Sequence, residues 1–132
     1  MKVLVDTSVW SLALRRGGDS KAKAVQELRS LIADKRVQMI GAIRQEILSG
    51  IRDEAQFKEL ETRLSAFPDL QVTDEDYVAA ARFFNVCRAK GIQGSNTDFL
   101  ICAVAVRHRL AIFTTDKDFT LYAKHLPIAM HP

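Results

Sequence analysis

The sequence is poor in the residues that staple or interrupt small proteins, with two cysteines, three prolines and six glycines among its 132 residues. So few cysteines exclude a disulfide-rich scaffold, and Cys87 and Cys102 both lie in apolar helical patterns that favour buried thiols. No apolar run approaches the roughly 20 residues of a membrane span. The start also lacks the basic flank and long apolar segment of a secretory signal. We therefore expect one domain over residues 1–132, cytoplasmic and reduced, with no membrane partner.

A strong excess of charge of one sign is also missing. The chain has 19 Lys and Arg against 16 Asp and Glu, a net charge of +3, which alone predicts no partner. If four of the acids lie together in one site, the other 12 acids leave the 19 bases with an excess of +7. Such a basic surface around an acidic pit would suit a polyanionic substrate.

Short β-branched runs alternate with helical patterns along the chain. Strands are expected at residues 2–5, 37–40, 70–72, 110–115 and 128–130, and helices at 20–34, 42–49, 53–66, 74–90 and 97–109, with a short one before the last strand. This alternation predicts parallel βαβ units, and so an α/β fold: a three-layer α/β/α sandwich around a short, mainly parallel sheet of four or five strands. In such folds, ligands bind beyond the carboxyl ends of the strands.

Four acids stand out against this framework. Asp6 follows the run KVLV and Asp116 follows LAIFTT, so both come at the ends of expected strands. Glu46 lies in an apolar stretch of an expected helix, and Asp98 opens the most apolar helix of the chain. Each has an ordinary explanation too: Asp6, Asp98 and Asp116 could cap or open helices, and Glu46 could be an exposed helix residue.

Taken together, the four acids predict a metal site. Two carboxylates in close contact repel by about 4 kcal/mol at an effective dielectric of about 20, so a cluster needs shared protons or a cation. The three histidines (His108, His125 and His131) have no ligand spacing, and all-oxygen ligation indicates Mg²⁺ or Mn²⁺. Because Mg²⁺ prefers phosphate oxygens as further ligands, the natural substrate is a phosphodiester.

Four motifs in order along nearly the whole chain, VDTSVW, RQEILSG, TDFLICAVAVRHRL and FTTDKDF, resemble those of PIN domains, specifically the VapC-type ribonuclease toxins of toxin–antitoxin pairs. The resemblance implies a PIN-like nuclease domain over residues 1–132 and an endoribonuclease with Asp6, Glu46, Asp98 and Asp116 as catalytic residues. Asp6, Asp98 and Asp116 would hold Mg²⁺ or Mn²⁺, and Glu46 would help to deprotonate or orient the attacking water. The chain departs from many relatives at Phe99, where they carry Ala.

Polar neighbours of these acids are auxiliary candidates. The hydroxyls of Thr7 and Ser8 could bond a metal-bound water or a phosphate, or could simply cap the helix that follows. Thr115 has the same two interpretations, with capping the simpler one. Asp118 could assist or replace Asp116, because the DKD spacing offers two carboxylates.

The resemblance also implies partners besides an RNA substrate. A small cognate antitoxin would cover the acidic crevice, with an Arg or Lys entering the cluster. A homodimer would form through helical faces, for which residues 53–66 offer an apolar stripe. Arg15 and Arg16 would form a basic loop suited to an RNA backbone or only to solubility.

Three other functions compete with the nuclease. A receiver-like signalling module needs an adjacent acidic pair, which Asp6 lacks, and a phosphatase of the DxDxT type needs a second Asp that VDTSV does not have. No glycine-rich phosphate loop is present. A catalytically silent PIN-like module that binds RNA or protein is the remaining alternative, because four acids in the right order do not by themselves establish cleavage.

Overall fold

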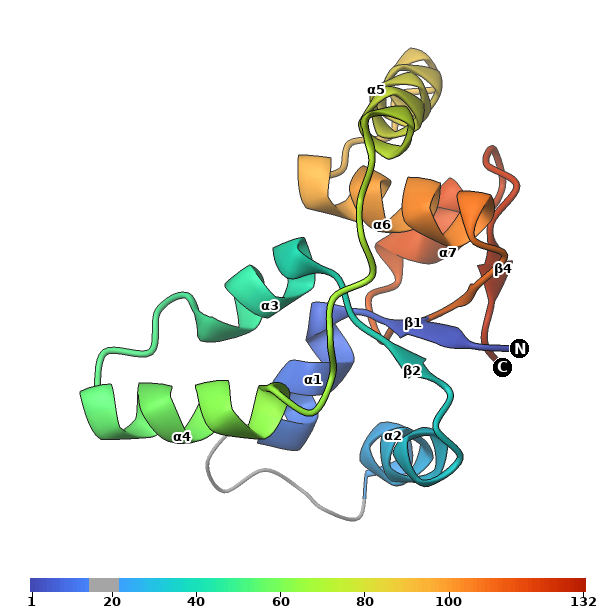
Figure 1. Cartoon of the computed structure of the whole chain (residues 1–132). Coiled ribbons are helices and arrows are strands. Elements are labelled where there is room, and N and C mark those ends of the chain that lie inside the picture. Colours follow the sequence, from blue (N-terminus) through green and yellow to red (C-terminus); the bar gives the residue numbers. More distant parts are fainter. Residues whose placement is uncertain (15–21) are drawn as a thin grey trace.

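The computed structural model in Figure 1 describes residues 1–14 and 22–132 and has a four-stranded sheet in the order β2-β1-β3-β4. The strands are β1 (Val3–Val5), β2 (Val37–Gln38), β3 (Ala111–Phe113) and β4 (Ala129–Met130). Every neighbouring pair is parallel, with Val3 paired to Val37 on one side and to Ala111 on the other. The expected basic loop at Arg15 and Arg16, and the expected helix start at Ser20, lie outside the described residues.

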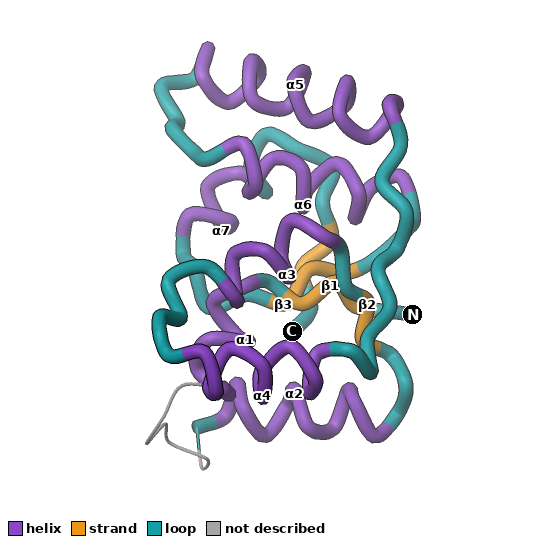
Figure 2. The backbone as a smooth tube through the Cα atoms, turned by 60° about the vertical axis from the view of Figure 1, so that its left-hand side comes forward, coloured by secondary structure: helices purple, strands orange, loops and turns teal. Residues whose placement is uncertain are grey.

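Helices cover both faces of this sheet, and those described are α1 (Thr7–Leu14), α2 (Lys23–Ala33), α3 (Gly41–Leu48), α4 (Glu54–Leu64), α5 (Asp74–Ala89), α6 (Asn96–Arg107) and α7 (Asp118–Tyr122). Figures 1 and 2 show α6 and α7 on one side of the sheet, with α5 stacked on the outside of α6. Helices α1, α2 and α4 lie on the other side. The expected three-layer α/β/α sandwich with a parallel sheet is confirmed.

The strand expected at residues 70–72 is wrong. The chain makes one isolated parallel bridge there, between Met39 and Asp69, and the Leu70 N–H donates to the Met39 carbonyl at 2.8 Å. Arg44 on α3 binds the same turn, donating to the Phe67 carbonyl and to the Asp69 carboxylate. Because these side-chain bonds hold the turn to α3, the segment does not continue along the sheet edge.

The most buried helix is α6, as its apolar sequence predicts. Seven consecutive residues, from Phe99 to Ala105, are buried. At its start, the Ser95 hydroxyl accepts from the Asp98 N–H at 3.1 Å, so Asp98 lies in the first turn. Cys87 and Cys102 are free and buried, as predicted. Within the described part of the chain, every helix is too short or too polar to cross a membrane.

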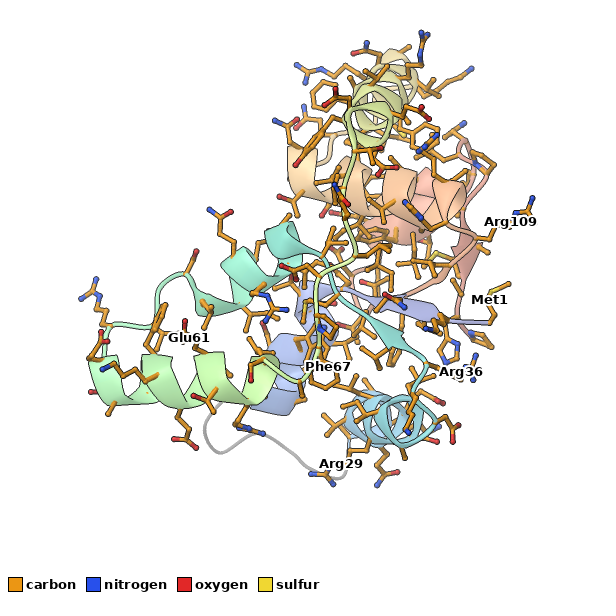
Figure 3. The ribbon with its side chains drawn as sticks, in the orientation of Figure 1. Met1, Arg29, Arg36, Glu61, Phe67 and Arg109 are labelled. Carbon is orange, nitrogen blue, oxygen red and sulfur yellow. The ribbon has the colours of Figure 1, made fainter. Side chains whose placement is uncertain are left out.

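The apolar stripe of α4 is used inside the chain rather than presented on its surface. Leu60 and Leu64 are buried in the core. Phe67, just beyond the helix, lies between α4 and α1, with its ring centroid 5.1 Å from that of Trp10, whereas Glu61 projects outward (Figure 3). The face expected to serve a homodimer is therefore already packed against the rest of this chain.

Candidate active site

The carboxyl ends of β1 and β3 meet at one edge of the sheet, and hydrogen bonds join the residues that follow them. The Asp6 N–H donates to the carbonyl of Phe113, the last residue of β3, at 2.8 Å. The Thr114 hydroxyl donates to Asp6 Oδ2 at 2.7 Å and accepts from the Asp116 N–H at 3.0 Å. One hydroxyl thus connects two of the predicted acids, although Thr114 and Asp6 are 108 residues apart in sequence.

Asp6 is only 5% exposed, and a buried carboxylate needs partners to offset its lost hydration. Besides Thr114, the Ser8 hydroxyl donates to Asp6 Oδ2, at 3.0 Å. Ser8 is held in turn by the Thr115 N–H, which donates to its oxygen at 3.1 Å. Both donors bind Oδ2, and no hydrogen bond to Asp6 Oδ1 is found among the described residues. That oxygen is free to bind another group.

Asp98 lies in the first turn of α6, close enough to the same edge to feel the charges of Asp6 and Asp116. The Tyr122 hydroxyl donates to its Oδ2 at 2.7 Å. Burial raises the pKa of the Asp98 carboxyl, and the charges of Asp6 and Asp116 raise it further, while hydrogen bonds with Tyr122 and Ser95 act in the opposite direction. This mutual repulsion is what carboxylates gathered in one place produce. The charges of Asp6 and Asp116 act on Asp98, which places the three carboxylates near the same edge of the sheet.

Glu46 joins this group at its rim, from α3. The Thr7 hydroxyl donates to Glu46 Oε1 at 2.6 Å. Thr7 is the residue after Asp6 and the first of α1, so the bond ties α3 to the start of α1. Glu46 is exposed, as expected of an acid that meets solvent.

Among the auxiliary candidates, the hydroxyls of Thr7 and Ser8 bind acids of this group. The side chain of Thr115 is exposed and only its N–H takes part, whereas Thr114, which the sequence reasoning missed, bridges the acids. Thr114 directly follows β3, whose three residues are all buried, so it is the first polar residue at the carboxyl end of that strand. Asp118 is exposed and opens α7, and its N–H donates to Asp116 Oδ1 at 2.9 Å.

Oxygen donors dominate this edge, and these are the ligands that Mg²⁺ and Mn²⁺ accept. Within residues 1–14 and 22–132, no three Asp, Glu, His or Cys side chains are grouped closely enough to hold an ion by themselves. Mg²⁺ is usually bound through one or two carboxylates, with water and substrate phosphate as its other ligands. The residues therefore fit such an ion by their chemistry.

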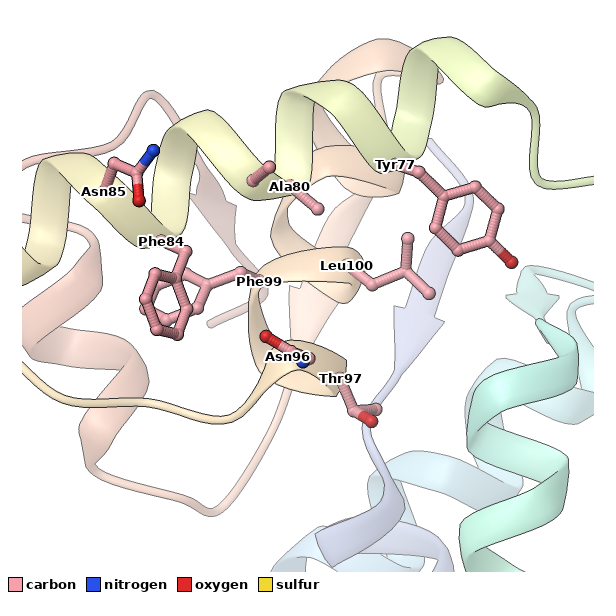
Figure 4. A pocket seen from close by; sticks show the side chains of 9 residues that line it. Tyr77, Ala80, Phe84, Asn85, Asn96, Thr97, Phe99 and Leu100 are labelled. Carbon is pink, nitrogen blue, oxygen red and sulfur yellow. The ribbon is translucent and has the colours of Figure 1, made fainter.

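A second, largely apolar pocket of about 450 Å³ lies between α5 and α6 (Figure 4). Its lining consists of Tyr77, Ala80, Ala81, Phe84, Asn85, Asn96, Thr97, Phe99 and Leu100. None of the four acids is among these residues. We therefore place the chemistry at the sheet edge and not in this pocket.

Comparison with known proteins agrees with this architecture. The family model described as PIN domain matches residues 3–125. The chain is 37% identical over 124 residues to Ribonuclease VapC11 of Mycobacterium tuberculosis, and equally to a VapC ribonuclease of Mycobacterium bovis, with 92% of each chain covered.

Two solved structures are similar in fold. FitAcB from Neisseria gonorrhoeae matches with a TM-score of 0.78 and 22% identity, over 98% of this chain and 96% of that one. VapBC2 from Rickettsia felis, bound to a DNA fragment from its promoter, matches with a TM-score of 0.77 and 15% identity, over 99% and 98%. At these identities the likeness concerns the fold.

Proposed function

Since this chain belongs to the PIN-domain family, and within it to the VapC ribonucleases, we propose that it is a metal-dependent endoribonuclease toxin inhibited by a cognate antitoxin. We take residues 1–132 to act as a single nuclease domain. The observation that carries the proposal is the meeting of Asp6, Asp98 and Asp116 at one edge of the sheet. Burial is the main cause of the raised pKa of Asp98, and the nearby charges of Asp6 and Asp116 add to it, as in a site that could hold a cation.

In the proposed mechanism, Asp6, Asp98 and Asp116 are the residues that would hold Mg²⁺ or Mn²⁺. Such an ion, when bound, lowers the pKa of water and offsets charge on a scissile phosphate. We assign Glu46 to the attacking water, which it orients and deprotonates. Water adds to phosphorus, the bond from phosphorus to the 3′ oxygen breaks, and the products are a 3′-hydroxyl and a 5′-phosphate.

The proposed protein partner is an antitoxin with a cationic segment. The acidic edge offers carboxylate oxygens that an Arg or Lys side chain could pair with, without any metal. The pairing of VapB with VapC in the Rickettsia felis structure supports a partner of this kind. A partner seated there would exclude RNA from the acids and so inhibit cleavage.

We also propose a homodimer, with a different face from the one first expected. The stripe on α4 is buried within the chain, whereas α5 presents Tyr77 and Val78 to solvent, 57% and 56% exposed. Exposed apolar side chains on one helix are suited to a contact between copies.

The test of the nuclease proposal is cleavage of a mixed RNA pool with added Mg²⁺ or Mn²⁺. We expect cleavage that EDTA abolishes and that Asp6→Asn reduces by about a hundredfold or more, because metal-assisted hydrolysis is worth several kcal/mol. The matched control is Asp34→Asn. Asp34 is an exposed residue at the end of α2, and it is not one of the four proposed catalytic acids.

Two results would contradict the proposal in different ways. Cleavage that survives both EDTA and Asp6→Asn would exclude a metal mechanism at this site. RNA binding without cleavage, under any of the metals added, would favour the catalytically silent RNA-binding module instead.

A further inference from the structure

We propose that Tyr122 is a positioning residue for Asp98, and that Gly94 provides the space its hydroxyl needs. The inference rests on the proposed function, in which Asp98 is one of the acids that hold the ion. Tyr122 itself touches neither ion nor RNA in this scheme. It acts only through the carboxylate to which it donates.

The first support is that Tyr122 is fixed in place. Its side chain is fully buried, at 0% exposure, although it comes from the short helix α7. Its ring centroid lies 4.9 Å from that of Phe99 and 5.1 Å from that of Phe119. Packing on two sides by rings restricts the phenol to one orientation, in which its hydroxyl meets Asp98 at 2.7 Å.

The second support is that the two oxygens of the Asp98 carboxylate have different hydrogen-bond partners. Oδ2 accepts from Tyr122, while Oδ1 has no hydrogen-bond donor among the residues that the structure describes. A carboxylate held at one oxygen cannot rotate freely, so its other oxygen keeps one direction. Hydrogen bonds behind a metal-binding side chain commonly orient it in this way.

The third support is the chemistry of the donor. A phenol orients the carboxylate and leaves its negative charge in place, because the hydroxyl is neutral. An Arg or Lys at the same position would form an ion pair and cancel the charge that a cation requires. A neutral, buried donor is therefore the type of group that suits this role.

Gly94 explains how the hydroxyl fits beside the loop that precedes α6. A Cβ placed on Gly94 would collide with the Tyr122 hydroxyl, and it would lie 2.9 Å from two atoms of the Phe99 ring. Separations this short require a neighbour to move. A larger residue at position 94 would therefore force the Tyr122 hydroxyl, the Phe99 ring or the loop to shift, and so disturb the bond to Asp98.

The experiment compares Mn²⁺ binding to the RNA-free protein, by calorimetry, in wild type and in Tyr122→Phe. We expect the variant to bind Mn²⁺ about tenfold more weakly, the usual scale for an orienting hydrogen bond. The Mn²⁺ concentration for half-maximal RNA cleavage should rise by a similar factor, while cleavage at saturating Mn²⁺ should recover most of its rate.

Two control variants separate positioning from a loss of stability. Tyr77→Phe removes the same hydroxyl from an exposed position on α5 and should leave Mn²⁺ binding unchanged. Phe84→Leu weakens the aromatic packing on Phe99 without touching Tyr122, so it should lower the melting temperature but leave Mn²⁺ affinity within about twofold.

Gly94→Ala provides a second route to the same answer. It should weaken Mn²⁺ binding in the wild-type background and weaken it less in the Tyr122→Phe background, where the hydroxyl is gone and only the contact with the Phe99 ring remains. If Tyr122→Phe binds Mn²⁺ as tightly as wild type does, Tyr122 does not position Asp98. The same holds if Phe84→Leu loses as much Mn²⁺ affinity as Tyr122→Phe does. Either result would leave the proposed metal mechanism standing. Wild-type protein that binds no Mn²⁺ would overturn the proposed metal mechanism as well.

Discussion

At the scale of single residues, Thr114 connects two acids of the candidate site. Its hydroxyl is both a donor to the Asp6 carboxylate and an acceptor from the Asp116 N–H. Removal of a donor from a buried carboxylate leaves that charge poorly compensated. The geometry of both acids therefore depends on one oxygen atom.

Thr114→Val, which keeps the shape of the side chain, should reduce RNA cleavage by about tenfold. It should also lower the free energy of unfolding by about 1–2 kcal/mol, because the bonds of the Thr114 hydroxyl with Asp6, the Asp116 N–H and Ser8 are lost. Cleavage rates and urea denaturation measure the two effects. Thr115→Val is the control and should have near wild-type values in both, since the Thr115 side chain is exposed. Equal losses in the two variants would contradict the bridging role.

Asp98 gives a prediction that depends on pH. Burial and the neighbouring Asp6 and Asp116 charges raise its pKa above the ordinary value of 3.8. Folded protein thus binds its proton more tightly than unfolded protein does. As pH rises from below 3.8 through the raised pKa, the contribution of Asp98 to stability falls.

In EDTA at pH 7, Asp98→Asn should therefore melt at a higher temperature than wild type. In a separate assay with Mg²⁺ or Mn²⁺ added, the same variant should lose RNA cleavage. The difference in melting temperature should disappear below pH 3.8, where wild-type Asp98 is protonated in both states. Thermal melts across this pH range check the sign. A variant that melts lower than wild type at pH 7 would show that the Asp98 charge stabilises the metal-free fold.

The acids and the nearby hydroxyls of Thr7 and Ser8 could be identified from the sequence, but the hydroxyls of Thr114 and Tyr122 were not. A carboxylate after an apolar strand is unusual enough to be noticed alone, as Asp6 and Asp116 were. Tyr122 lies 24 residues from Asp98 and Thr114 lies 108 from Asp6. Contacts over such separations follow from the packing of the whole chain, which local patterns do not specify.

At the scale of elements, a buried acid fastens α5 to α6. Asp76, at 0% exposure, accepts from the Thr73 N–H at 2.9 Å and from Arg107 Nε at 2.6 Å. Burial alone would raise the pKa of Asp76, but the bonds from Thr73 and Arg107, together with nearby His108, outweigh it and the pKa is lowered. Ionised Asp76 therefore stabilises the fold above its ordinary pKa, and the stability is lost as pH falls through the lowered value.

Arg107→Met should lower the free energy of unfolding, because it leaves a buried carboxylate without its main charged partner. The effect is smaller than for a fully buried pair, since Arg107 itself is partly exposed. Urea denaturation at pH 7 measures it. Glu75→Gln removes the exposed partner of the same arginine and should cost less than about 1 kcal/mol. A larger loss for Glu75→Gln than for Arg107→Met would contradict this assignment.

Helices were predicted well because their signals are local. Apolar spacing and caps such as Ser95 before α6, and the Thr73–Asp76 capping box at α5, set their limits within a few residues. The false strand at residues 70–72 had only three residues of pattern. This segment forms a turn instead, and Arg44 on α3 binds that turn.

At the scale of the whole molecule, sequence patterns predicted the layers and the parallel sheet but not which elements cover which surface. The apolar stripe of α4 looked available for a partner, yet Leu60 and Leu64 are buried within the chain. Exposure of Tyr77 and Val78 on α5 was not expected. Whether an apolar face is internal or external depends on tertiary packing, because amphipathic helices look alike in both cases.

The pairing of β1 with β3 has a consequence for synthesis of the protein in the cell. Phe113 and Thr114, which complete the surroundings of Asp6, are made more than a hundred positions after it. Until β3 has been made, Asp6 therefore lacks both of these hydrogen-bond partners. The proposed nuclease site can therefore form only after β3 has been synthesised and has paired with β1.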